Sequence, residues 1–267
     1  MLRYSVNASI LLTDLPLLAR PEAAKRAGFD AVELWWPFPR AVPPDSEVDA
    51  FVAAVSDSGV QLTGLNFFAG DMAAGERGLV SSKSRQHEFV DNIDVVVGIG
   101  ERLGCRAFNA LYGLSGEDTD ADEAAAVGVE SLARAARAVQ TIGGTVLLEP
   151  VSGSETYPLK TAADALAVID DVHAAGSENV ALLADFYHLS VNGDDVAALV
   201  AERAATFGHI QIADAPGRGA PGSGALPLAS WLQEAEDRGY AGWVGLEYKS
   251  EDPDPFAWLP REHRAAG

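Results

Sequence analysis

The chain has 267 residues, of which 48% are hydrophobic and 22% are charged, and its formal net charge is -20. This composition is ordinary for a soluble globular protein and supplies ample apolar material for a core. The acidic excess argues against DNA or RNA as the main partner, since affinity for a phosphate backbone comes largely from Lys and Arg side chains. We therefore expect a small-molecule substrate.

The sequence offers little sign of export or of membrane insertion. Its one cysteine, Cys105, cannot form an internal disulfide, which fits a reducing compartment. The apolar stretch near the N-terminus is interrupted by Asp14 and Pro16, so we expect no signal peptide. No run reaches the roughly 20 apolar residues that a membrane span requires. We expect a cytoplasmic protein with no membrane partner.

Short hydrophobic runs alternate with amphipathic segments along the whole chain. The runs are too short for helices and are bounded by Gly, Pro or polar turns, so they indicate buried strands. Gly28 and Gly59 stand just before two of these runs and mark the ends of the preceding helices. The predicted strands cover residues 4–7, 31–35, 61–66, 107–111, 146–149, 181–185, 209–212 and 244–247. The predicted helices cover residues 15–27, 45–58, 84–103, 120–143, 161–175, 195–206 and 228–238.

This alternation predicts an α/β fold. Eight strands, mostly separated by one helix and without a Pro/Gly/Ser-rich linker, favour a single (β/α)₈ barrel over a doubly wound open sheet. A barrel of this kind typically needs about 250 residues. We therefore predict one domain over residues 1–267, with a short C-terminal extension from about residue 250.

Polar residues stand at or near the end of every predicted strand, where active sites of such barrels lie. They are Asn7, Glu33, Asn66, Asn109, Glu149, Asp185, Gln211 and Glu247. The last four follow strongly apolar runs, and a buried carboxylate without a partner is costly. One interpretation is that each is satisfied separately by an Arg, a Lys or a backbone amide. The sharper hypothesis is a shared divalent cation, Mg²⁺ or Mn²⁺, because three carboxylates and an amide form an oxygen-rich site.

Glu149 and Glu247 come from the fifth and eighth strands, so they should face each other across the bound substrate. That geometry suits proton transfer beside a carbonyl, in which one glutamate removes a proton and the other supplies one. The pattern therefore predicts isomerase or epimerase chemistry with these two residues as catalytic groups. The chain has no phosphate-loop signature and no GxGxxG motif after a strand, so nucleotides are not expected.

Further polar residues near the strand ends are candidates for binding substrate. His188 lies beyond the sixth strand and could hold a substrate oxygen, whereas His209 could be a core histidine below Gln211 or a ligand. Arg77 and Arg218 lie in Gly-rich loops, expected to be flexible, and either bind an anionic substrate or pin their own loops. Lys249 could contact substrate or form a salt bridge. The predicted substrate-binding residues are His188, Arg218, Arg77, Lys249, Asn66 and Glu155.

The chain resembles the hydroxypyruvate isomerase family, within the xylose isomerase-like barrels. The loop Gly70 to Gly78 is its most specific match, although Met72 stands where Trp is common in that family. The other matching stretches are residues 32–37, 148–150, 185–188, 209–214, 218–224 and 242–249. The resemblance implies interconversion of hydroxypyruvate and tartronate semialdehyde, with Glu149 and Glu247 as the acid/base pair. It also implies that the metal is held by Glu149, Asp185, Gln211 and Glu247.

Alternative functions remain open at this stage. A 2-oxo-tetronate isomerase or a ketose 3-epimerase would use the same metal site, although related epimerases usually have His where Gln211 stands. Repair nucleases of this fold need many His residues and a cationic face, which five His and a charge of -20 do not supply. A barrel that only binds a sugar acid would not need both glutamates. Family habit also suggests a homo-oligomer.

Overall fold

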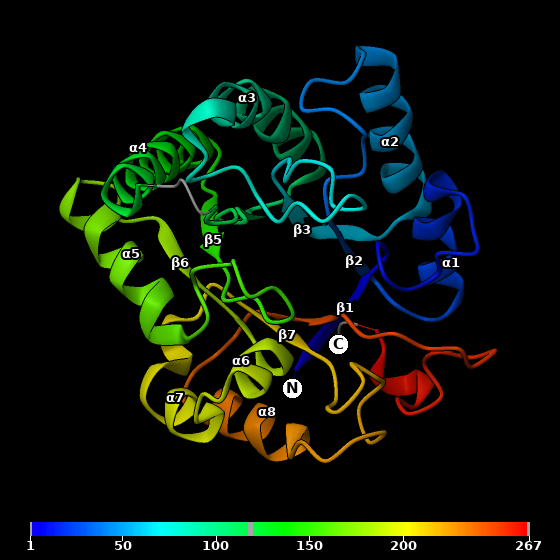
Figure 1. The fold of residues 1–267 in the computed structure, drawn as a ribbon. Coiled ribbons are helices and arrows are strands. Elements are labelled where there is room, and N and C mark those ends of the chain that lie inside the picture. Colours follow the sequence, from blue (N-terminus) through cyan, green and yellow to red (C-terminus); the bar gives the residue numbers. More distant parts are fainter. Residues whose placement is uncertain (1, 117–119, 266–267) are drawn as a thin grey trace.

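The computed structural model describes residues 2–116 and 120–265, in which eight parallel strands close into one barrel in chain order from β1 to β8. This confirms the predicted (β/α)₈ architecture (Figure 1). The strands are β1 (Arg3–Asn7), β2 (Ala31–Leu34), β3 (Gln61–Asn66), β4 (Ala107–Asn109), β5 (Thr145–Leu148), β6 (Val180–Asp185), β7 (His209–Ile212) and β8 (Trp243–Leu246).

Helices surround the barrel and bury their apolar faces against it (Figure 1). They are α1 (Arg20–Arg26), α2 (Asp45–Ser58), α3 (Gln86–Leu103), α4 (Ala121–Gln140), α5 (Ala162–Ala174), α6 (Phe186–Asn192), α7 (Val196–Arg203) and α8 (Leu228–Asp237). Short 3₁₀ turns are Leu17–Ala19, Lys83–Arg85, Ala204–Thr206 and Arg261–His263. Gly59 ends α2 with a φ of 70°, a left-handed conformation that glycine adopts without steric cost.

One helix was not predicted from the sequence. The short helix α6 begins directly after β6, because Oδ1 of Asp185 accepts hydrogen bonds from the backbone N–H groups of Tyr187 and His188. A carboxylate in this position satisfies two of the N–H groups that have no partner within the first turn of a helix. His188 is thus held on the first turn of α6, next to the strand end that carries Asp185.

The last part of the chain replaces a helix. In the described part of the chain no α-helix follows β8, and residues 250–265 instead pack along β1 and α1 as an irregular tail (Figure 1). Phe256 stacks on Phe29, and Trp258 meets Tyr4 edge to face. Arg264 donates hydrogen bonds to the carbonyl oxygens of Leu259, Phe256 and Ala27. These contacts cover the side of the barrel where β8 meets β1.

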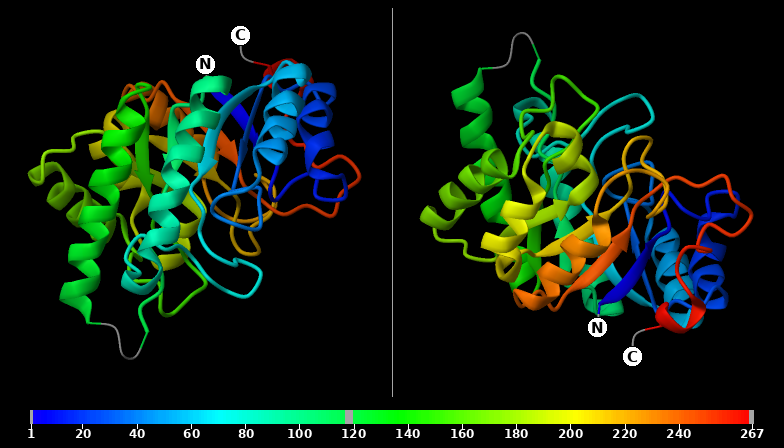
Figure 2. Two further views of the ribbon diagram at one scale, coloured as in Figure 1. Left: turned by 90° about the horizontal axis from the view of Figure 1, so that it is seen from above. Right: turned by 90° about the horizontal axis from the view of Figure 1, so that it is seen from below.

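The loops that follow β3 and β7 extend from the face of the barrel opposite the N-terminus (Figure 2). This face contains the carboxyl ends of all eight parallel strands. It therefore collects the polar residues that the sequence places at those ends. Within the described residues, no helix combines the length and the apolar character needed to cross a bilayer.

Candidate active site

The four predicted metal ligands meet at the carboxyl ends of β5 to β8. Asp185 pairs in register with Gln211, and Gln211 pairs with Gly245, two residues before Glu247. Glu149, Asp185, Gln211 and Glu247 are all buried. Five buried side-chain oxygens have no hydrogen-bond partner within the described residues, and four of them belong to Asn109, Asp185, Gln211 and Glu247. Such a concentration of unpaired oxygens marks a place built to receive a ligand.

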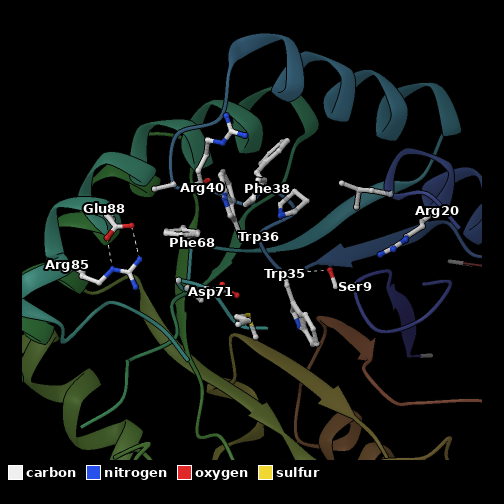
Figure 3. A pocket seen from close by; sticks show the side chains of 17 residues that line it. Ser9, Arg20, Trp35, Trp36, Phe38, Arg40, Phe68, Asp71, Arg85 and Glu88 are labelled. Atoms are coloured by element: carbon white, nitrogen blue, oxygen red, sulfur yellow. Dashed lines mark hydrogen bonds and ion pairs between the residues drawn. The ribbon is translucent and has the colours of Figure 1, made fainter. Parts of the chain in front are cut away.

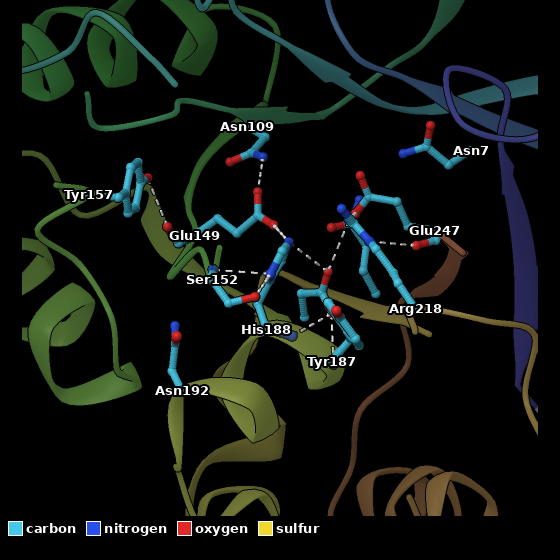
Figure 4. Close-up of polar contacts among 12 residues, drawn as sticks. Asn7, Asn109, Glu149, Ser152, Tyr157, Tyr187, His188, Asn192, Arg218 and Glu247 are labelled. Carbon is cyan, nitrogen blue, oxygen red and sulfur yellow. Dashed lines mark hydrogen bonds and ion pairs between the residues drawn. The ribbon is translucent and has the colours of Figure 1, made fainter. Parts of the chain in front are cut away.

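Glu149 and Glu247 approach the site from opposite sides, with His188 and Arg218 between them (Figure 4). Oε2 of Glu149 accepts a 2.6 Å hydrogen bond from Nδ2 of Asn109. Oε1 of Glu247 accepts a 2.6 Å hydrogen bond from Nε1 of Trp35, and its Oε2 lies 3.2 Å from a guanidinium nitrogen of Arg218. Each glutamate is thus oriented by one neutral donor, which leaves its second oxygen toward the site.

Burial changes the proton affinity of both glutamates. It raises the pKa of Glu149 well above its ordinary value, and the carboxylates of Glu247 and Asp185 add to this effect. It also raises the pKa of Glu247 to about 8, although the Arg218 guanidinium acts in the opposite direction. Carboxyl groups whose pKa approaches the working pH can both take up and release a proton, which is what general acid and base catalysis requires.

His188 is held as a neutral hydrogen-bond donor. Its Nδ1 accepts from the backbone N–H of Ser152 at 3.1 Å and lies 2.7 Å from the Ser152 hydroxyl. Because Nδ1 accepts, the ring proton must be on Nε2, which points into the site at 3.9 Å from Glu149 Oε1 and 3.7 Å from Asp185 Oδ2. Burial lowers the pKa of His188 to about 4. The ring therefore offers an N–H to a substrate oxygen.

The donor set suits a hard divalent cation. Ligand atoms of Glu149, Asp185 and His188 lie within 4.8 Å of one another, a spacing compatible with one ion. In its Nε2–H form, however, His188 has no free lone pair there to coordinate a metal. The oxygens of Asp185, Gln211 and Glu247 that lack a hydrogen-bond partner, two of them facing Arg218, form the more suitable set together with Glu149. Carboxylate and amide oxygens are the donors that Mg²⁺ and Mn²⁺ prefer.

Arg218 is positioned by a hydrogen-bonded loop between β7 and α8. Its guanidinium lies 3.8 Å from Asp185 Oδ2 and 5.6 Å from the Tyr187 ring centroid. Asp214 fixes the loop, because its carboxylate accepts hydrogen bonds from the backbone N–H groups of Ala215, Gly222 and Leu226. The expected flexibility of this Gly-rich segment is thus countered by a buried anion at its base.

Arg77 is hydrogen-bonded within its own loop, which is one of the two roles that the sequence left open for it. One guanidinium nitrogen donates to the carbonyl oxygens of Met72 and Glu76. The loop is further tied by Glu76, which accepts from the backbone N–H of Asp71 and pairs with Arg85. Arg77 nevertheless lines the cavity above the glutamates.

A cavity of about 560 Å³ opens above the two glutamates. It is lined by His188, Arg218, Arg77, Lys249 and Asn66, all of which the sequence predicted to bind substrate. Glu155 does not join them, because it is exposed on the loop between β5 and α5 and does not line this cavity. Asp185 and Gln211 lie deeper, below the cavity floor.

Sequence reasoning missed several residues of the site. Trp35, Ser152 and Tyr187 line the cavity, yet none of these residue types signals a function by itself. Trp35 could have been found from its place directly after β2, at the catalytic end of the barrel. Ser152 gave no such signal, because its role depends on the distant His188.

A second cavity of about 620 Å³ adjoins the first and shares Trp35 and Met72 with it (Figure 3). Its arginines already have partners. Arg85 pairs with Glu88 and Glu76, while Arg20 donates to backbone carbonyl oxygens. Nothing in its lining matches the concentration of unpaired oxygens at the first cavity.

Known proteins resemble this chain over nearly its full length. The family described as "Xylose isomerase-like TIM barrel" matches residues 21–266. A Streptomyces coelicolor protein named provisionally as a hydroxypyruvate isomerase is 50% identical, covering 99% of this chain and 98% of its own length. The hydroxypyruvate isomerase of Escherichia coli is 32% identical, with 94% of this chain and 95% of the relative covered.

Two further relatives bear other names. A 2-oxo-tetronate isomerase of Cupriavidus necator is 33% identical, with 93% of each chain covered. A crystal structure named AP endonuclease, family 2, from Brucella melitensis is 30% identical with a TM-score of 0.88, covering 97% of this chain and 98% of that chain. The relatives thus share one barrel but carry names from two classes of enzyme.

Proposed function

Since the chain belongs to the xylose isomerase-like TIM barrel family, we propose that it is an isomerase that interconverts hydroxypyruvate and 2-hydroxy-3-oxopropanoate (tartronate semialdehyde). The observation that carries this proposal is the placement of two buried glutamates on opposite sides of one cavity, with a neutral histidine donor between them. The relatives named as hydroxypyruvate isomerases support it.

The reaction moves a proton between adjacent carbons of the substrate. One of Glu149 and Glu247 takes a proton from C3 of hydroxypyruvate, and the resulting enediolate receives a proton at C2 from the other. The hydroxyl proton passes from O3 to O2, so no atom or electron is gained or lost overall. The Nε2–H of His188 points toward the site and would hold a substrate oxygen while negative charge develops on it.

We further propose that Glu149, Asp185, Gln211 and Glu247 hold a divalent cation, Mg²⁺ or Mn²⁺. When bound, the cation polarises the substrate oxygens and stabilises the enediolate as a Lewis acid. The buried oxygens of Asp185, Gln211 and Glu247 that lack a hydrogen-bond partner support this assignment. The positions of Arg218, Arg77 and Lys249 around the cavity support an anionic substrate, since a guanidinium binds a carboxylate through two hydrogen bonds.

A longer hydroxy-keto acid is the second candidate substrate. The cavity of about 560 Å³ exceeds what a three-carbon acid fills, and one relative is a 2-oxo-tetronate isomerase. A nuclease function fits less well, because the cavity floor is acidic and the chain carries a net charge of -20.

The buried free thiol of Cys105 supports a cytoplasmic location for the protein. Self-association stays a prediction.

Proton NMR in D₂O would test the proposal. Purified protein with Mg²⁺ should convert hydroxypyruvate to tartronate semialdehyde and introduce deuterium at carbon. A parallel sample with 2-oxo-tetronate would show which acid is turned over faster. Absence of both product and deuterium exchange with either acid would refute the proposed reaction.

A further inference from the structure

A buried carboxylate, that of Glu33, lies inside the barrel beneath the proposed metal site. Its Oε1 accepts hydrogen bonds from Nε2 of Gln211 at 2.6 Å and from Nδ2 of Asn7 at 3.1 Å. Its Oε2 lies 2.7 Å from Nε2 of His209. Four side chains from β1, β2 and β7 thus form one connected polar group below the catalytic face. His209 therefore belongs to this group in the barrel core.

The contact with Glu33 determines which way the Gln211 amide faces. If the amide were reversed, its carbonyl oxygen would stand 2.6 Å from Glu33 Oε1, and two acceptors at that distance repel each other. The NH₂ group must therefore face Glu33, which turns Oε1 of Gln211 the other way. That oxygen is buried and has no hydrogen-bond partner within the described residues. Leaving a buried carbonyl oxygen without a partner is costly, so the orientation needs support.

The backbone leaves room for this carboxylate at one particular residue. A Cβ atom at Gly245 would lie 2.5 Å from both Oε1 and Oε2 of Glu33, which is closer than such atoms approach in real proteins. Gly245 is also the register partner of Gln211 in the neighbouring strand β8. A side chain at this position would therefore displace the Glu33 carboxylate from beneath Gln211.

We propose that Glu33 is a positioning residue that holds Gln211 with its carbonyl oxygen directed at the cation site. This inference rests on the proposed function, since it assumes that Gln211 is a metal ligand. Asn7 and His209 in turn hold the Glu33 carboxylate in place through one oxygen each. Partners that orient a ligand from behind typically contribute about 10- to 100-fold to metal affinity.

Two substitutions at Glu33 separate orientation from charge. Glu33→Met removes both acceptors, so Mn²⁺ affinity should fall by about 10- to 100-fold. Glu33→Gln removes the charge but keeps a carbonyl that can accept from Gln211 and Asn7. Its NH₂ group faces Nε2 of His209, which accepts from it when the imidazole carries its proton on Nδ1. The Glu33→Gln variant should lose much less affinity than Glu33→Met. Binding is measured on metal-free protein from the electron paramagnetic resonance signal of free Mn²⁺.

The same link can be broken without changing a polar group. Gly245→Ala should weaken Mn²⁺ binding because its Cβ displaces Glu33, whereas Gly98→Ala in α3, where the added Cβ meets nothing within 4 Å, should not. In a Gln211→Ala background, Glu33→Met should cause little further loss, since the group it orients is gone. Thermal unfolding of the metal-free variants confirms that they are folded.

The outcomes separate the proposed metal site from the proposed role of Glu33. If the unmodified protein fails to bind Mn²⁺, the proposed metal site is wrong and the role of Glu33 falls with it. If the unmodified protein binds Mn²⁺ but Glu33→Met and Gly245→Ala bind equally well, only the positioning role is wrong. Equal losses in Glu33→Gln and Glu33→Met would assign the effect to charge and also overturn the inference.

Discussion

The indole Nε1 of Trp35 donates a 2.6 Å hydrogen bond to Oε1 of Glu247, joining the end of β2 to the end of β8, the two strands that flank β1. This bond stabilises the charged form of Glu247 and partly offsets the burial that raises its pKa to about 8. Trp35 also lines the cavity, so one side chain both shapes the proposed substrate site and adjusts the proposed acid/base group.

Trp35→Phe removes this hydrogen bond and keeps an aromatic ring in the wall of the cavity. A hydrogen bond to a charged group contributes about 1.5–3 kcal/mol, so kcat/KM should fall by roughly tenfold or more. The pH at which activity rises should move upward, because the pKa of Glu247 increases without its donor. Trp36→Phe is the matched control, since Nε1 of Trp36 donates to the carbonyl oxygen of Arg40 on an exposed segment. Unchanged pH dependence in Trp35→Phe would assign the tryptophan to packing alone.

Glu149→Gln tests the acid/base assignment most directly. The amide keeps the size of the side chain and can accept from Nδ2 of Asn109, but it cannot transfer a proton. Turnover should fall by about 100- to 10,000-fold, the usual contribution of such a group, while the melting temperature changes little. Glu202→Gln, at an exposed position in α7, serves as the control. Near-normal turnover in Glu149→Gln would remove Glu149 from the mechanism.

Removal of metal should reduce both activity and stability. Without a cation, the buried carboxylates of Glu149, Asp185 and Glu247 repel one another, and Arg218 offsets this repulsion in part by pairing with Asp185 and Glu247. A ligand present at 100 times its Kd stabilises the folded state by about 2.7 kcal/mol. Adding Mg²⁺ or Mn²⁺ to chelator-treated protein should therefore raise Tm by roughly 5–10 °C. Equal Tm values and equal activity in the two states would contradict the proposed metal site.

Asp214→Asn should loosen the loop that carries Arg218. An amide cannot accept from all the backbone N–H groups that the carboxylate satisfies, and an unmet hydrogen bond to a charged group costs about 1.5–3 kcal/mol. We expect a lower Tm and a higher KM for an anionic substrate. Asp195→Asn makes the same change of charge at the N-terminal cap of α7 outside the site but keeps an oxygen that accepts from the Ala198 N–H, so it should leave Tm and KM nearly unchanged. An unchanged KM in Asp214→Asn would show that the position of Arg218 does not depend on Asp214.

The effect of Asp214 should also depend on pH. Burial acts to raise its pKa, but the backbone N–H groups of Leu226, Gly224, Gly222 and Ala215 lower it below the ordinary value of 3.8. Its folded pKa is therefore below the unfolded one, so its contribution to stability is complete above about pH 3.8 and is lost as the pH falls through the folded pKa. The Tm difference between the unmodified protein and Asp214→Asn should shrink in acid.

Much of the fold could be predicted because its signals are local. Each strand is a short apolar run, and α2 matches its predicted bounds because Gly59 ends it. Helix α6 was missed because its start depends on the Asp185 carboxylate, and it follows the strand without a break in hydrophobicity. The sequence predicts no helix after the eighth strand, only a short C-terminal extension from about residue 250, and the described tail after β8 contains no α-helix.

The site was predictable to the extent that function requires charged groups at strand ends. Glu149, Asp185, Gln211 and Glu247 could be selected as candidates in this way, and the structure buries all four at the carboxyl ends of β5 to β8. The residues that orient the side chains of the site could not be predicted from the sequence. Ser152 acts on His188 from 36 positions away, and Glu33 contacts Gln211 across 178 positions. Such contacts exist only once the barrel has closed, so no local pattern encodes them.

The tail after β8 is held in place by side-chain contacts with other parts of the molecule. A helix satisfies its own backbone hydrogen bonds, whereas residues 250–265 depend on docked aromatic rings and on Arg264 reaching the carbonyl oxygens of Ala27 and Phe256. This segment can therefore detach without unwinding any α-helix, and its amides should exchange with deuterium earlier than those of α3 or α4.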